Sequence, residues 1–203
     1  MSLAEWRSRH ERQLAAAGRA EAGVVFLGDS ITEAWIETDS LQRQLRAYHP
    51  LNLGIGGDQT QHVLWRIEQG TLDGLSARLV VVLIGVNNLG NGYGPEETAR
   101  GIAAVVRRVR KKLPQARVLL LKVLPAGEHA SDDLRRGVLA TNELLPALAE
   151  PGSVELLDIG GLLLEPDGSI ASETMKDFLH PTELAYRAMT DAVVPVVLRL
   201  LDQ

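Results

Sequence analysis

Short, unbroken apolar runs recur along the chain and predict the strands of a sheet. Five such runs stand out, at residues 24–27, 51–53, 79–84, 117–123 and 154–157. Their interiors are continuous Val, Leu and Ile rather than an alternation of apolar and polar positions. That pattern is typical of parallel strands that helices cover on both faces.

Stretches with helical spacing lie between these runs. The clearest is the one with Ile102, Val105, Val106, Val109 and Leu113, where Arg and Lys fill the outer face. We expect further helices over about residues 5–18, 134–148 and 184–200. Strand and helix therefore alternate, with short connections and no internal repeat. This alternation predicts one α/β domain over residues 1–203, a three-layer α/β/α sandwich.

The order of the strands decides where a ligand binds. If the chain reverses direction after the second strand, the five-stranded parallel sheet has the order 2-1-3-4-5. The switch point then lies between strands 1 and 3, and ligands bind outside the carboxyl ends of these strands.

Composition excludes several classes of function. The chain has 203 residues, a net charge of −5, 45% hydrophobic residues and no cysteine. Disulfides, thiolate catalysis and Cys-ligated metals are therefore excluded. Acidic and basic residues are dispersed, so we expect no nucleic-acid surface, and no segment is apolar enough for a membrane span. The first residues carry no apolar signal core, which favours a cytoplasmic protein.

A serine stands directly after the first predicted strand, in Gly28-Asp29-Ser30. At the end of a parallel strand its hydroxyl is presented at the functional edge of the sheet, where a base could activate it as a nucleophile. The alternative is a serine that only caps the following helix.

Asp177 and His180 supply a candidate base near the other end of the chain. Three residues of separation in a helical turn would place both side chains on one face. The carboxylate could then hold Nδ1–H of the imidazole and leave Nε2 facing Ser30. The sequence 181–183 predicts that Pro181 begins the last helix. A capping Asp beside an unrelated surface His is the alternative.

Two further strand ends supply candidate oxyanion donors. Gly57 ends a glycine-rich loop after strand 2, and Asn87 follows strand 3. With the N–H of Ser30, the Gly57 N–H and the Asn87 amide would make three donors around one oxygen. Plain turns at both places are the alternative. Asp58 is interpreted as the N-cap of the next helix, with Gln61 completing a capping box.

No histidine spacing indicates a metal site. His10, His49, His62 and His129 lack the separation of zinc ligands, so each is interpreted as structural.

Taken together, the blocks around Ser30, Gly57, Asn87 and His180 resemble the SGNH hydrolases, also called the GDSL esterase/lipase family. These four residues match those behind the first name, and Asp177 completes the triad. The segments 52–58 and 62–66 are most similar to the branch that contains the platelet-activating-factor acetylhydrolase catalytic subunits and bacterial acetylesterase-like proteins. The resemblance implies a flavodoxin-like fold. Ala126 stands where this branch often has Arg, which leaves the substrate open.

The resemblance implies a serine esterase that needs neither a metal nor a cofactor and acts on a small-molecule ester. Because the predicted loops are short and none forms an apolar lid, we expect short-chain, acetyl esters as substrates. A thioesterase or lysophospholipase on the same scaffold is one alternative, and a noncatalytic flavodoxin-like binding module is another. The branch includes dimers, so a homodimer is one option by analogy.

Overall fold

A five-stranded parallel sheet forms the centre of the protein. The computed structural model describes residues 1–16 and 18–202. Within these residues the strand order is β2-β1-β3-β4-β5, as predicted. The strands are β1 (Val24–Gly28), β2 (Leu51–Gly54), β3 (Leu79–Leu83), β4 (Arg117–Leu121) and β5 (Val154–Leu157).

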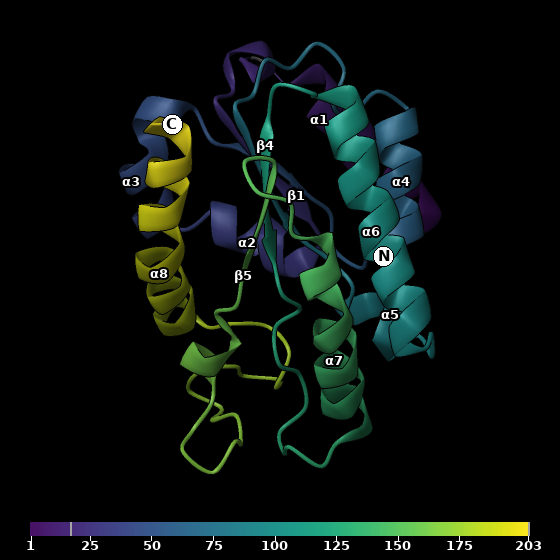
Figure 1. The fold of residues 1–203 in the computed structure, drawn as a ribbon, viewed down its shortest axis with the longest axis vertical. Helices are drawn as coiled ribbons and strands as arrows, with labels where there is room; N and C mark the ends of the chain where they lie inside the picture. Colours follow the sequence, from purple (N-terminus) through teal and green to yellow (C-terminus); the bar gives the residue numbers. More distant parts are fainter. Residues whose placement is uncertain (17, 203) are drawn as a thin grey trace.

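Helices cover both faces of this sheet (Figure 1). Figure 1 shows α3 and α8 on one side and α4, α6 and α7 on the other. The helices are α1 (Leu3–Ala15), α2 (Ser30–Ile36), α3 (Asp39–Leu45), α4 (Thr60–Glu68), α5 (Val86–Gly90), α6 (Pro95–Lys112), α7 (Asp133–Leu144) and α8 (Glu183–Asp202), with short 3-10 turns at Arg19–Glu21, Arg46–Tyr48, Leu145–Leu148 and Gly160–Leu163. The sheet is therefore the middle layer of three, and all residues of β1 and β3 are buried.

Two strands end earlier than predicted, for reasons that lie outside the apolar pattern. After β3, Gly85 adopts a φ of +132° and turns the chain out of the sheet. After β4, the backbone N–H and C=O of Val123 bond to the side chain of Asn142 on α7 instead of to a neighbouring strand. As a result β3 ends one residue, and β4 two residues, before its predicted end.

The register brings the polar strand ends together. Gly28 at the end of β1 pairs with Gly54 of β2 and with Leu83 of β3. Because all strands are parallel, the segments that follow these residues leave the sheet at one edge. Ser30, the loop 55–58 and the start of α5 therefore lie at the same carboxyl edge, which is where open α/β sheets place their ligands.

Candidate active site

Ser30 is the first residue of α2 and follows β1 after a single intervening residue, Asp29. The carboxylate of Asp29 accepts the N–H of Ile31 at 3.0 Å and is therefore the N-cap of α2. The interpretation of Ser30 as a helix cap is wrong, because its neighbour has that role. The hydroxyl of Ser30 is left free to bond elsewhere.

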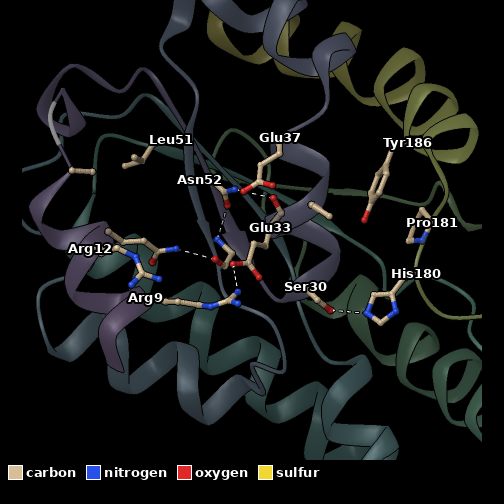
Figure 2. A pocket seen from close by; sticks show the side chains of 14 residues that line it. Arg9, Arg12, Ser30, Glu33, Glu37, Leu51, Asn52, His180, Pro181 and Tyr186 are labelled. Atoms are coloured by element: carbon tan, nitrogen blue, oxygen red, sulfur yellow. Dashed lines mark hydrogen bonds and ion pairs between the residues drawn. The ribbon is translucent and has the colours of Figure 1, made fainter. Parts of the chain in front are cut away.

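The Ser30 hydroxyl bonds to a histidine 150 positions away in the sequence. Ser30 Oγ lies 2.9 Å from His180 Nε2 (Figure 2). On the far side of the ring, His180 Nδ1 lies 2.7 Å from Asp177 Oδ2. A carboxylate can only accept, so Nδ1 carries the hydrogen and Nε2 is the acceptor for the serine hydroxyl. The structure thus brings the three predicted side chains into one hydrogen-bonded chain.

The local backbone around Asp177 differs from the prediction. The segment is not helical, since Phe178 adopts a φ of +58° and α8 begins only at Glu183, two residues after Pro181. A tight turn replaces the predicted helical turn. Asp177 Oδ1 accepts the N–H groups of Leu179 and His180, and this holds the carboxylate beneath the imidazole.

The Asp177–His180 pair is close to solvent. The His180 side chain is 44% exposed and that of Asp177 is 56% exposed. Slight burial raises the pKa of Asp177, but the hydrogen bonds from the ring and the backbone N–H of His180 outweigh it and hold that pKa below its ordinary value. Asp177 is therefore ionised at neutral pH, and its charge can orient the ring and stabilise an imidazolium.

Side-chain contacts of Asn87 connect the backbone segments that carry the predicted oxyanion donors. Asn87, on α5, donates through Nδ2 to the carbonyl of Asp58 at 2.9 Å and to Asp29 Oδ2 at 3.5 Å. These acceptors are the direct neighbours of Gly57 and Ser30. Gly57 has a φ of +77°, a conformation that disfavours other residues. The contacts of Asn87 therefore tie together the three backbone segments that carry the predicted donors.

Asp58 has a different role from the predicted one. It is fully buried, and it accepts from Arg66 at 2.6 and 2.9 Å and from Trp6 Nε1 at 2.6 Å. Gln59 precedes α4 instead, and its N–H donates to His62 Nδ1. The predicted capping box of Asp58 and Gln61 is therefore wrong. An ion pair with the buried Arg66 decides the position of Asp58, and no local sequence pattern predicted this ion pair.

Arg66 connects this ion pair to the sheet. Its guanidinium also donates to the carbonyls of Leu53 and Gly28, at the ends of β2 and β1. A planar donor with five N–H groups suits such a site, where several acceptors converge. Arg66 lies in the helix predicted after Asp58, and no sequence pattern indicated that its charge is buried.

Asp29 is a further candidate for a functional role, which no sequence pattern indicated. It is almost fully buried, 1% exposed, directly before Ser30. Burial raises the pKa of Asp29 to about 7, although the bond from the Ile31 N–H opposes the shift. In the segment Gly28-Asp29-Ser30 the sequence indicated a role for the serine only. The raised pKa of Asp29 follows from its burial, which the sequence does not show.

A cavity of about 820 Å³ opens beside Ser30 and His180. Figure 2 shows Ser30 and His180 at one end and Arg9 and Arg12 of α1 at the other, with Glu33 between them. Polar and charged side chains make up much of the lining. In the described part of the chain, no three His, Asp or Glu residues gather closely enough to hold a metal ion.

Comparisons with known proteins identify the class. The model of the GDSL-like Lipase/Acylhydrolase family matches residues 26–188. Human platelet-activating factor acetylhydrolase IB subunit alpha1 is 39% identical over 199 residues, which cover 98% of this chain and 85% of the human protein. The same subunit from Bos taurus is also 39% identical, over 98% of this chain and 84% of the bovine protein.

Solved structures show the same fold. A GDSL-like lipase from Bacteroides thetaiotaomicron superposes with a TM-score of 0.79 at 22% identity, covering 98% of this chain and 99% of that one. Est24, a carbohydrate acetylesterase from Sinorhizobium meliloti, gives a TM-score of 0.68 at 19% identity, covering 88% and 99%.

Fold and relatives together define an ester-hydrolysing enzyme of the acylhydrolase class. The chain belongs to the GDSL-like lipase/acylhydrolase family. The predicted resemblance is confirmed, and the alternative of a noncatalytic binding module is set aside. In the part of the chain that is described, no helix has the length and apolarity to cross a membrane. The cytoplasmic location and the homodimer stay predictions.

Proposed function

We propose that this enzyme is a serine esterase that hydrolyses short-chain esters, with acetyl esters as its preferred substrates. The observation that carries the proposal is the chain of two hydrogen bonds, Ser30 Oγ to His180 Nε2 at 2.9 Å and His180 Nδ1 to Asp177 Oδ2 at 2.7 Å. A nucleophile, a base and a residue that orients the base stand within hydrogen-bonding reach of one another, as nucleophilic catalysis requires.

In the first step His180 Nε2 takes the proton of Ser30 as Oγ attacks the acyl carbon. The N–H groups of Ser30 and Gly57 stabilise the developing oxyanion together with Asn87, whose Nδ2 turns its long, 3.5 Å bond from Asp29 to the oxyanion. His180 then gives the proton to the leaving alcohol, and an acyl-enzyme remains on Ser30. In the second step His180 activates a water molecule, which releases the acid and restores the serine.

Two observations support short acyl chains. Human and bovine relatives are named as acetylhydrolases, and Est24 is described as an acetylesterase. In the cavity next to Ser30, charged side chains such as Arg9, Arg12 and Glu33 share the wall with Leu51, Pro181 and Tyr186, so a long acyl chain would have to pass charged groups. Each methylene buried against apolar surface contributes about 0.8 kcal/mol, and methylenes that face these charged groups contribute less.

The first test is covalent labelling of the nucleophile. We expect a fluorophosphonate to add one adduct to the intact protein and peptide mapping to locate it on Ser30, because only an activated hydroxyl reacts at a useful rate. The variant Ser30→Ala is the control and should stay unlabelled. An adduct on another residue, or no adduct at all, would overturn the proposed nucleophile.

The second test concerns the substrate. We expect p-nitrophenyl acetate to be hydrolysed faster than the butyrate and much faster than the decanoate, measured as kcat/KM. Faster turnover of the decanoate would contradict the acetyl preference. Acyl thioesters and lysophospholipids belong in the same panel, since the same triad serves a thioesterase or lysophospholipase. Preference for either would replace the proposed substrate class and leave the proposed site intact.

A further inference from the structure

Glu33 joins the nucleophile helix to the loop that carries a predicted oxyanion donor. It lies on α2, three positions after Ser30. Its Oε2 accepts the backbone N–H of Gly56 at 2.9 Å. Its other oxygen, Oε1, accepts from Arg9 Nη1 of α1 at 2.5 Å. Figure 2 shows Arg9 reaching Glu33 across the cavity wall. One carboxylate thus links its own helix, α2, to two other parts of the chain, α1 and the loop at Gly56.

The Gly56 N–H that donates to Glu33 is directly adjacent to the predicted oxyanion donor, the N–H of Gly57. The peptide between Gly56 and Gly57 carries the N–H that would bind the oxyanion. This loop also lies against the nucleophile, because a Cβ added to Gly56 would stand 3.7 Å from Ser30 Cβ. Gly54, just before the loop, has no room for a side chain because Glu33 backbone atoms pack against it.

Among the described residues, the other bonds that hold this loop act on its two ends, Ile55 and Asp58, and not on its two glycines. The Ile55 N–H donates to the carbonyl of Gly28 at 3.2 Å, and the Asp58 N–H donates back to Ile55 at 3.1 Å. Gly56 and Gly57 lack side chains that could pack, and glycine has more backbone freedom than any other residue. Two consecutive glycines therefore need an external partner to keep one conformation, and Glu33 supplies a charge-assisted hydrogen bond to the first of them.

We propose that Glu33 is a positioning residue for the reaction: it fixes the Gly56–Gly57 peptide so that the Gly57 N–H points at the oxyanion. The proposal rests on the function proposed above. Arg9 has a secondary part, because it holds the second oxygen of Glu33 and so fixes the carboxylate. Glu33 itself does not contact the reacting atoms.

The variants separate this role from a general structural one. Glu33→Ala removes the acceptor of the Gly56 N–H. Misplacement of a catalytic donor by about 1 Å costs up to about 10²-fold in rate, so we expect kcat to fall by about 10- to 100-fold with KM changed less than about 2-fold. Glu33→Gln keeps an oxygen that can accept from Gly56 and should recover kcat to within about 3-fold of the wild type.

Two further variants complete the set. Arg9→Ala leaves the bond to Gly56 in place, so its loss should be smaller than that of Glu33→Ala. Glu68→Ala is the matched control, because Glu68 pairs with an arginine of a neighbouring helix, Arg108, but lies away from the cavity. It should keep the wild-type kcat.

Kinetics with p-nitrophenyl acetate and inhibition by an aryl trifluoromethyl ketone give the readout. Addition of Ser30 Oγ to this ketone, with the proton passing to His180, forms a hemiketal with an oxyanion. We expect its Ki to rise in Glu33→Ala by the same factor by which kcat/KM falls, because both depend on the Gly57 N–H. Equal kcat and Ki for Glu33→Ala and Glu68→Ala would overturn the proposal.

Hydrogen–deuterium exchange tests the contact without any need for catalysis. The Gly56 amide should be protected in the wild type and in Glu68→Ala, and should exchange faster in Glu33→Ala. Unchanged protection would overturn the role of Glu33 even if the protein hydrolyses esters. A wild type that neither reacts with fluorophosphonate at Ser30 nor hydrolyses esters, but shows this change in exchange, would instead contradict the proposed function.

Discussion

Two carboxylates each pair with a nitrogen-bearing side chain, Asp58 with Arg66 and Asp177 with His180, and the two pairs differ in almost every physical respect. Asp58 and Arg66 are completely buried, and both come from the segment between β2 and β3. Asp177 and His180 are about half exposed and lie in a turn before α8. The buried pair adds bonds to Trp6 and to the carbonyls of two strands, whereas the exposed pair adds bonds within its own turn and one from outside it, donated by Ser30 Oγ to His180 Nε2.

This difference fits two roles: the buried pair holds the backbone in place, and the exposed pair is proposed to transfer a proton. A buried ion pair with every acceptor occupied has one arrangement, which suits the wall that carries the proposed oxyanion donors. An imidazole that must take and release a proton benefits from contact with water and from freedom to charge. We therefore expect changes in the buried pair to act on stability and changes in the exposed pair to act on activity.

The largest expected effect is on activity, in His180→Ala. Without its base the Ser30 hydroxyl stays protonated, and kcat for p-nitrophenyl acetate should fall by about 10⁵- to 10⁶-fold, as for other serine triads. The thermal midpoint should change by less than about 2 °C, because the side chain is partly exposed and buries little apolar surface.

His129→Ala is the control, since His129 is an exposed histidine that does not line the cavity beside Ser30, and its Nε2 lies 3.9 Å from Glu128 Oε2. It should keep full activity. Combining His180→Ala with Ser30→Ala should give no further loss, because the two residues act as a unit. A fully active His180→Ala enzyme would remove the basis for contrasting the two pairs.

The next effect is on stability, in Arg66→Met. The methionine is about as large as the arginine stem, but it leaves the Asp58 carboxylate buried and unpaired. Such a loss costs about 3–5 kcal/mol and should lower the midpoint of thermal unfolding, followed by circular dichroism, by on the order of 10 °C.

Arg187→Met is the matched control, because Arg187 pairs with Glu183 on the surface of α8. Exposed pairs of this kind contribute about 0–1 kcal/mol. The double variant Asp58→Asn with Arg66→Met removes both charges and should recover much of the loss. Similar midpoints for Arg66→Met and Arg187→Met would show that burial does not distinguish these pairs.

The smallest expected effect is on the pH dependence of stability, and it comes from Asp29. The pKa of Asp29 is about 7 in the folded protein against an ordinary value of 3.8. Between these values the folded state keeps a proton that the unfolded chain has lost. The stability that the neutral carboxyl contributes is therefore fully present below about pH 4 and is lost as pH rises towards 7.

Asp29→Asn should flatten this dependence, because an amide stays neutral and can still cap α2. Relative to the wild type, the variant should gain on the order of 2 kcal/mol between about pH 5 and pH 7.5, measured by denaturant unfolding at both. Asp39→Asn, at an exposed position, controls for the change in net charge. A difference from the wild type that is equal at both pH values would contradict the assignment of Asp29 as the titrating group.

Much of the fold follows from local sequence. The runs at β1 and β3 are apolar on both sides, so they can only be internal strands, and their glycine and polar successors mark the functional edge. Ser30, Asn87 and Gly57 were predicted at that edge for this reason. The end of β4 was missed because Asn142 on α7 bonds to the backbone of Val123. The start of α8 was missed because a turn with a positive φ at Phe178 precedes it.

The residues that surround the predicted site were harder to predict. Asp58 looked like a helix cap, and nothing indicated that Arg66 would be buried beside it, since a sequence does not show which opposite charges will meet. Glu33 had no signal beyond its place in a helix, because its partners Arg9 and Gly56 lie 24 and 23 positions away.

The sequence by itself determined the strands, their layering and the kinds of chemical group available at their ends, because apolar periodicity and glycine act over a few residues. Only the tertiary structure decided which of these groups meet. Ser30 and His180 are 150 positions apart, and their 2.9 Å contact depends on a complete sheet between them. Burial, which sets the charge state of Asp29 and the pairing of Asp58, likewise exists only once the layers have packed.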